Sequence, residues 1–127
     1  MTYHSMSASG IAEGVRTGRF SATEVFESSL ERIRAFEPGI HALLRVTEDR
    51  GRDAARSVDE AVKSGRDPGP LCGVPVVLKD NMTTRGIATT CASRILGDWK
   101  PPYDATVVQL LERAGAVVVG KANMDEF

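Results

Sequence analysis

The sequence predicts an α/β fold in which N-terminal helices are followed by part of a sheet. Three patterns support this prediction: a helix start followed by apolar residues at helical spacing, two short runs that are apolar throughout, and an amphipathic stretch between those runs. A strand, a long loop, a helix and a second strand, in that order, are typical of a right-handed βαβ unit whose two strands are parallel.

Two helices are expected in the first third of the chain. Residues 7–17 predict a weak helix with a thin apolar face. The second helix starts at a capping box, in which the Ser21 hydroxyl accepts from the Glu24 amide and the Glu24 carboxylate reaches back. Its apolar stripe consists of Val25, Phe26, Leu30, Ile33 and Phe36. Pro38 predicts the end of this helix, because proline disfavours helical geometry in the residue before it.

The next stretch predicts a strand, a charged helix and a linker. Residues 42–46 form a short apolar run, 47–63 predict a helix with a narrow Ala and Val face, and 64–70 are rich in glycine and proline. Two oppositely charged pairs four residues apart are expected to stabilise the helix by roughly 0.2–0.5 kcal/mol each: Arg56–Glu60 and Asp59–Lys63. We interpret its charged side as a solvated face rather than a partner surface.

The second half predicts the βαβ unit. Residues 74–78 are apolar at both alternations, which is typical of a strand buried on both faces. A loop rich in Thr and Ser follows at 81–93, and Asp104 is expected to cap the next helix. The expected buried face of that helix consists of Val107, Val108, Leu111 and Ala114. Gly115 ends it as the C′ residue, and 116–119 predict a second buried strand.

Composition excludes several functional classes. The chain has 127 residues, 42% of them hydrophobic, and a net charge of -1, so it lacks the basic character of a dedicated nucleic-acid-binding protein. No apolar run approaches the roughly 20 residues of a membrane span, and we expect no membrane association and a cytoplasmic location. Two cysteines and two histidines are too few for a disulfide framework or a recognisable metal site.

Polar residues follow both predicted strands, where α/β sheets place their ligands. Lys79, Asp80 and Asn81 come directly after the first strand, and Lys121 to Glu126 follow the second. Lys79 continues a fully apolar run, so we expect its stem to start inside the protein, where burial favours the neutral amine of a general base. Asp80 should point to the opposite face, because neighbouring strand residues alternate. A lysine beside loop hydroxyls could activate a serine nucleophile.

Several segments in order resemble the amidase signature family. They are GVPVVLKDN at 73–81, GIATTCAS at 86–93, PPYDATVV at 101–108, AGA at 114–116, GK at 120–121 and NMDEF at 123–127. Ala122 stands where the family would have Thr. Within the family, the match is most similar to the glutamine-hydrolysing A subunits of tRNA-dependent amidotransferases.

The resemblance implies a fold, a site and partners. The fold would be part of the mixed-sheet α/β/α amidase signature fold, with 1–127 as the N-terminal part of one domain, mainly helical over 1–66 and beginning the catalytic sheet at 71–127. Family members hydrolyse a carboxamide with a Ser–cis-Ser–Lys triad, in which the lysine corresponds to Lys79. We expect Asp80, Asn81, Thr90 and Asp125 to support that site.

In that branch of the family the substrate is glutamine, and the released ammonia passes to a B subunit. The B subunit uses ATP and magnesium to convert Glu-tRNA(Gln) or Asp-tRNA(Asn) to the amidated form, and a small C subunit joins the two. The resemblance therefore implies B and C partners and tRNA contact through the complex, mainly on a partner. No cofactor or metal is expected in this chain itself.

The sequence departs from the family in one respect that matters. It contains no Gly/Ser-rich signature carrying the two serines, so we expect a truncated, catalytically inactive portion of a longer enzyme. Two alternatives remain open. The parent protein could be another amide hydrolase of the same family, or the chain could be a stand-alone, non-catalytic α/β module, which would then fold cooperatively by itself.

Overall fold

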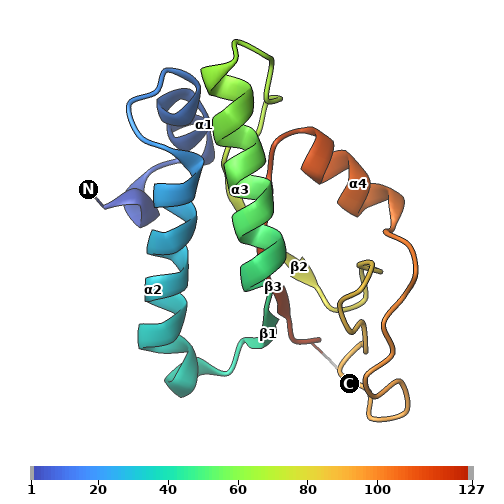
Figure 1. Cartoon of the computed structure of the whole chain (residues 1–127). Coiled ribbons are helices and arrows are strands. Elements are labelled where there is room, and N and C mark those ends of the chain that lie inside the picture. Colours follow the sequence, from blue (N-terminus) through green and yellow to red (C-terminus); the bar gives the residue numbers. More distant parts are fainter. Residues whose placement is uncertain (1, 126–127) are drawn as a thin grey trace.

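The computed structural model describes residues 2–125 and places a small sheet between helices (Figure 1). In chain order the elements are a short 3₁₀ turn η1 (Tyr3–Ser5), α1 (Ala8–Arg16), α2 (Ala22–Ile40), β1 (Leu43–Val46), α3 (Glu48–Lys63), β2 (Pro75–Lys79), α4 (Thr106–Arg113) and β3 (Val117–Ala122). The predicted α/β class is confirmed. No helix within this range is long and apolar enough to cross a bilayer.

The sheet is mixed, with strand order β1-β3-β2. β2 and β3 are parallel and are connected through α4, as the βαβ pattern predicts, whereas β1 runs antiparallel to β3. The strand predicted at 42–46 therefore belongs to the same sheet as the second half of the chain.

Helices pack on both faces of β3, and its residues separate the two layers of the core. Val117 and Val119 pack in the larger cluster with α1, α2 and α3, while Val118 packs in a smaller cluster with Leu78 of β2 and Val108 of α4. Figure 1 shows α2 and α3 side by side, with α4 apart from them. All three valines are almost completely buried, so the prediction of a buried strand here is confirmed.

β2 corrects the prediction of a strand buried on both faces. It lies at one edge of the described sheet, and Val77 is 47% exposed. A continuous apolar run does not show how far helices cover each face of a strand, and Val77 lines a groove that the helices on its face leave open. Val77 is therefore apolar without being covered in this part of the chain.

The capping box of α2 is confirmed, and the start of this helix is held more firmly than the sequence indicated. The Glu24 amide donates to the Ser21 hydroxyl, and the Ser21 amide donates to the Glu24 carboxylate. Asp59 of α3 accepts from the Ala22 amide at 2.7 Å and from the Thr23 amide at 3.1 Å. The predicted Asp59–Lys63 pair is thus wrong, because the carboxylate faces α2.

The end of α2 and an ion pair within α3 also differ from prediction. α2 continues through Pro38 to Ile40 and ends at His41, whose backbone is left-handed with φ 56°. In the last turn a missing proline amide removes one hydrogen bond without breaking the helix. Arg56 lies 3.8 Å from Asp53 rather than pairing with Glu60.

α4 starts one residue later than Asp104 would place it. Its N-cap is Ala105, and no side chain caps it. The Asp104 carboxylate instead accepts from the Arg85 amide at 2.8 Å and from Arg50 of α3 at 3.0 Å. Of the four residues expected on the buried face of this helix only Val108 is fully buried, and Gly115 follows the helix with φ 87°, as its predicted C′ role requires.

Candidate functional site

The carboxyl ends of β2 and β3 carry two lysines with opposite exposure. The Lys79 side chain at the end of β2 is 38% exposed, whereas the Lys121 side chain in β3 is completely buried. The sequence predicted a stem inside the protein for Lys79. The Lys79 side chain is partly covered, whereas the fully buried lysine of this edge is Lys121.

A β-bulge explains why Lys121 points inward. Val76 is in register with Val118, but Val77 is in register with Gly120, so β3 contains one extra residue at this point. Because a bulge shifts the alternation of side chains, Lys121 shares the face of Val118 and not that of Val119. A Cβ atom at Gly120 would lie 2.9 Å from the Arg45 carbonyl oxygen, so the bulge requires glycine.

Asp80 is the buried partner of Lys121. It is fully buried, and its Oδ1 lies 3.2 Å from Lys121 Nζ. Its Oδ2 accepts from the Thr90 amide at 2.9 Å and from the Thr90 hydroxyl at 2.6 Å. Burial by itself raises the pKa of Asp80, but the Thr90 hydrogen bonds and the Lys121 charge outweigh it, so this pKa lies below its usual range.

Lys121 also holds the loop that follows β2. Its Nζ donates to the Met82 carbonyl at 2.9 Å and to the Thr89 hydroxyl at 3.2 Å. Burial lowers the pKa of Lys121, and Asp80 only partly offsets that effect. The lysine therefore connects β3 to two points of the loop at 81–93.

Arg45 of β1 completes a charged cluster across the three strands. It is in register with Lys121, its Nη1 lies 3.9 Å from Asp80 Oδ1, and it donates to the Ala88 carbonyl. Among the described residues, Asp80 Oδ1 is buried without a well-formed hydrogen bond, so it is held by these two cations alone. Sequence reasoning assigned no role to Arg45 or Lys121, although Lys121 follows an apolar run just as Lys79 does.

Lys79 points away from this cluster. Its Nζ donates to Asp125 Oδ1 at 2.7 Å, and that hydrogen bond lowers the pKa of Asp125. Asp80 lies on the other face, as alternation predicts. The structure thus brings Lys79 and Asp125 together at the surface and joins Asp80 to Thr90 in the interior.

Asn81 stands apart from both groups. It is exposed, and its side chain forms no hydrogen bond with any residue from 2 to 125. The loop turns back through Cys91 and Ala92, which have left-handed backbones with φ 51° and φ 57°. Such conformations are uncommon for residues other than glycine and mark a segment held by its surroundings.

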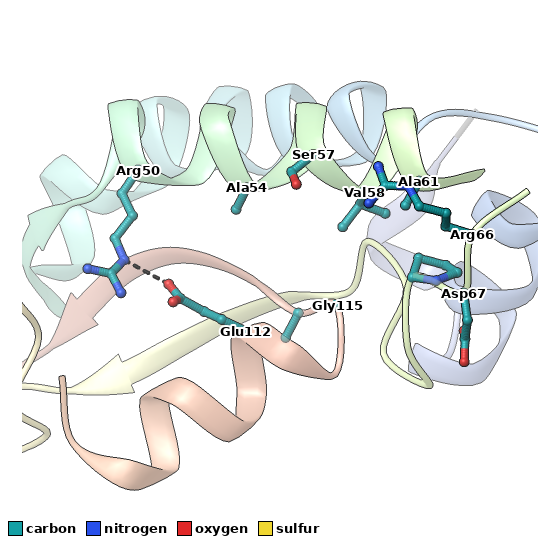
Figure 2. Close-up of a pocket in the computed structure, with 11 residues that line it drawn as sticks. Arg50, Ala54, Ser57, Val58, Ala61, Arg66, Asp67, Glu112 and Gly115 are labelled. Atoms are coloured by element: carbon teal, nitrogen blue, oxygen red, sulfur yellow. Dashed lines mark hydrogen bonds and ion pairs between the residues drawn. The ribbon is translucent and has the colours of Figure 1, made fainter. Parts of the chain in front are cut away.

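The hollow drawn in Figure 2 lies elsewhere. It has a volume of about 430 Å³ and opens between α3, α4 and the linker at 64–70. Arg50 and Glu112 form an ion pair at its border, with Nε and Oε1 2.7 Å apart. None of the candidate site residues lines it, so we place the candidate site at the sheet edge and not in this hollow.

Fold and site define an α/β protein that presents an accessible lysine amine at the carboxyl edge of its parallel strands, beside a loop held by buried charges. The chain belongs to the amidase family, whose model matches residues 24–127.

Individual relatives are similar over most of the chain. The A subunit of glutamyl-tRNA(Gln) amidotransferase from Carboxydothermus hydrogenoformans is 52% identical over 127 residues, which is 100% of this chain and 26% of that protein. The protein of the same name from Salinispora tropica is 50% identical over 97% of this chain and 25% of its own length. The chain thus spans about a quarter of the curated relatives that it matches.

Solved structures of the family share the fold. One, described as a vestigial protein complex that reveals the origins of an s-triazine catabolic enzyme, superposes with a TM-score of 0.91 at 37% identity, over 95% of this chain and 27% of its own. The peptide amidase from Stenotrophomonas maltophilia superposes with a TM-score of 0.88 at 32% identity, over 95% of this chain and 25% of its own.

Proposed function

We propose that this chain is the N-terminal portion of the glutamine-hydrolysing A subunit of a tRNA-dependent amidotransferase. The observation that carries the proposal is the identity of about half of all residues to proteins of that name. In the proposed reaction the complete protein releases ammonia from glutamine. A partner then uses the ammonia to amidate Glu-tRNA(Gln) or Asp-tRNA(Asn).

Lys79 is the general base in this proposal. Its amine lies at the sheet edge, where its partner is the exposed Asp125, whereas Lys121 is enclosed, pairs with Asp80 and donates to two oxygens of the loop. A general base must come within hydrogen-bond reach of the group it deprotonates. Lys79, with its amine neutral, would take the proton of the attacking serine through a bridging serine. The attacking oxygen would bond to the amide carbon, the C–N bond would break, and ammonia would leave with the proton that Lys79 returns. Water would then hydrolyse the acyl-enzyme to glutamate. Both serines would lie outside residues 1–127.

The proposal has consequences for the chain alone and for its assembly. Residues 1–127 contain the base without either serine of the triad, so by themselves they would not hydrolyse glutamine. The complete protein would work in the cytoplasm with B and C subunits. ATP and magnesium would act in the B subunit, and tRNA would contact mainly that partner.

A chimera makes the proposal testable. In this chimera, residues 1–127 replace the matching segment of the Carboxydothermus hydrogenoformans relative, and the product is assembled with the partner subunits of that organism. We expect the chimera to have glutaminase activity. We expect Lys79→Ala to lower that activity by roughly a thousandfold or more, because removing any one residue of a catalytic triad abolishes most of its rate enhancement. Lys63→Ala, an exposed lysine at the end of α3, is the control and should remain active.

Near-normal glutaminase activity of Lys79→Ala would contradict the assignment of the base. A chimera that assembles but hydrolyses no glutamine even with Lys79 intact would contradict the proposed function as a whole.

A second candidate is another amide hydrolase of the same family. It is favoured by the close superposition on the peptide amidase, which is named for a different substrate. The longer protein that carries this segment would then cleave a peptide amide or an aryl amide faster than glutamine. Comparing kcat/KM for glutamine and these two amides, with and without partner subunits, separates the two candidates.

A further inference from the structure

We infer that Asp80, Thr90 and Lys121 are positioning residues for Lys79, and that the buried charges serve to hold the loop at 81–93 against the end of β2. This inference rests on the proposed function of Lys79. It assigns a role to Lys121. In this role and in those of Asp80 and Thr90, the side chains fix the backbone of the loop beside Lys79 and do not contact the substrate.

The backbone around Lys79 is held on both sides. The Met82 amide donates to the Lys79 carbonyl at 2.9 Å, and the Asp80 amide donates to the Ala122 carbonyl at 3.0 Å. The Cys91 amide donates to the Asp80 carbonyl at 3.0 Å, which brings the far end of the loop back to the strand. The direction in which the Lys79 side chain leaves the sheet therefore depends on the conformation of the loop.

The side chains of Asp80 and Lys121 close the loop at two points. The Asp80 carboxylate accepts hydrogen bonds from both the amide and the hydroxyl of Thr90. The Lys121 amine donates to the Met82 carbonyl. The Lys121 contact holds Met82, which lies near the start of the loop. The Asp80 contacts hold Thr90, which lies near its far end. Removing either contact frees one end of the loop from the sheet.

The left-handed turn at Cys91 and Ala92 depends on the same buried carboxylate. The Thr90 hydroxyl donates to Asp80 and also accepts from the Ala92 amide at 3.2 Å. A backbone in this region costs free energy and persists only where its surroundings determine it. Thr90 thus connects the buried carboxylate to this turn of the loop.

The ionic character of the cluster suits positioning better than stability. A buried ion pair is weak support for stability, since apolar residues of similar volume often serve equally well. Asp80, Lys121 and Arg45 instead supply directional contacts to the carbonyls and amides of the loop. Directional contacts are what a catalytic amine needs, because a displacement of about 1 Å can cost roughly a hundredfold in rate.

The test uses Thr90→Val and Thr90→Ser in the chimera. Valine keeps the shape and removes the hydroxyl, whereas serine keeps the hydroxyl. We expect Thr90→Val to lower kcat for glutamine by roughly ten- to a hundredfold with KM changed by less than about threefold, and Thr90→Ser to restore most of kcat. Full kcat in Thr90→Val would overturn the inference, as would an equal loss in both variants.

Lys121 is tested by a charge-balanced pair of variants. Lys121→Met leaves the buried Asp80 with Arg45, 3.9 Å away, as its remaining cation, and is expected to lower both Tm and kcat. Asp80→Leu/Lys121→Met removes both charges, so its Tm should lie above that of the single variant while its kcat stays low. If kcat of the double variant equals that of the unsubstituted chimera, the inference fails. If Lys121→Met does not fold, the comparison of Thr90→Val with Thr90→Ser tests the inference instead.

The control is Asp59→Asn. Asp59 belongs to α3, and its carboxylate binds the first amides of α2, whose start lies at the opposite end of the molecule from the loop (Figure 1). It should lower Tm and leave kcat unchanged. The outcomes also separate the two proposals: an active Lys79→Ala variant defeats the proposed function, whereas an inactive Lys79→Ala variant beside fully active Thr90→Val defeats only the positioning role.

Discussion

Burial divides the charged residues of the sheet edge into two groups with different roles. Lys79 and Asp125 meet at the surface, 38% and 79% exposed, and are free to exchange partners with water or a ligand. Asp80 and Lys121 are enclosed and keep one set of contacts. An exposed pair contributes little to stability, and a buried one must keep its geometry because an unpaired charge there is costly.

Asp104, a carboxylate that is only partly buried, leads to a prediction on pH. Burial raises the pKa of Asp104, but the Arg85 amide and the Arg50 guanidinium together lower it further, so it lies below its usual range. Such a group stabilises the fold above its unfolded pKa, and this contribution is lost as pH falls through the lower folded pKa. Asp104→Asn in the chimera should lower the opening free energy at the Arg85 amide by about 1–2 kcal/mol at pH 7.

Hydrogen exchange of the Arg85 amide between about pH 3 and pH 7 measures this effect. The difference between the two proteins should shrink below about pH 4, the ordinary pKa of an aspartate. Asp98→Asn, in the exposed part of the neighbouring loop, is the control. A difference that stays constant with pH would contradict the assignment of the effect to the Asp104 charge.

At the scale of elements, α2 and α3 are joined by polar contacts at the start of α2 and by close packing near the start of α3. Asp59 of α3 binds the first amides of α2, where four helix amides have no partner within the helix. Near the start of α3, Gly51 lies against the ring of Phe26 in α2. These contacts hold the helical layer against one face of the sheet, opposite α4.

The Asp59 contact predicts a large effect from a partly exposed residue. Asp59→Ala should lower the opening free energy of α2 by about 1–2 kcal/mol, because it removes acceptors from two helix amides and the Thr23 hydroxyl. Asp53→Ala, on the exposed side of the same helix, should change it by less than about 0.5 kcal/mol. Hydrogen exchange in the first turn of α2 measures both, and equal effects would contradict the capping role.

Two helical glycines predict opposite effects of the same substitution. A Cβ at Gly51 would lie 2.3 Å from the Phe26 ring and 2.8 Å from the Val118 carbonyl oxygen, so Gly51→Ala should cost about 1–3 kcal/mol. Nothing lies within 4 Å of a Cβ at Gly39 in α2, where alanine should stabilise by about 0.5–1 kcal/mol. Thermal melting of the two chimera variants should shift in opposite directions, and a stabilising Gly51→Ala would contradict the packing described.

At the scale of the whole molecule, the described part of the sheet leaves apolar surface uncovered. β2 is an edge strand with Val77 exposed, and an apolar groove of about 410 Å³ runs between η1, α2 and the sheet. An uncovered edge with apolar side chains is a template for pairing with other chains. Whether residues 1–127 fold as an independent unit therefore depends on whether the β2 edge and the groove are covered.

The chain alone is expected to aggregate rather than unfold in one cooperative transition. Val77→Lys should raise its soluble fraction, because lysine on an edge strand opposes pairing between copies. Leu110→Lys, an equal change at an exposed position of α4, should have a smaller effect. Light scattering and thermal melting by circular dichroism measure this. A soluble chain with a cooperative transition would instead favour the stand-alone, non-catalytic module.

Elements with a local signature were predictable, and contacts across the sheet were not. The capping box at Ser21 and the C′ glycine at 115 were predicted correctly, since each depends on a few neighbouring residues. The partner of Asp59 and the cap at Asp104 were predicted wrongly, because each carboxylate binds an element distant in sequence. Lys79 and Asp80 were assigned to opposite faces correctly, since alternation is also local.

Local patterns of apolar and capping residues are thus sufficient to specify the α/β class, the βαβ order and the sheet edge at which Lys79 and Lys121 gather. Which lysine is enclosed needed the folded molecule. The bulge at Gly120 shifts the alternation of β3 and turns Lys121 toward Asp80, while the edge position of β2 leaves Lys79 accessible. Register and strand order are set by pairing between distant segments, and a pattern within one segment does not contain them.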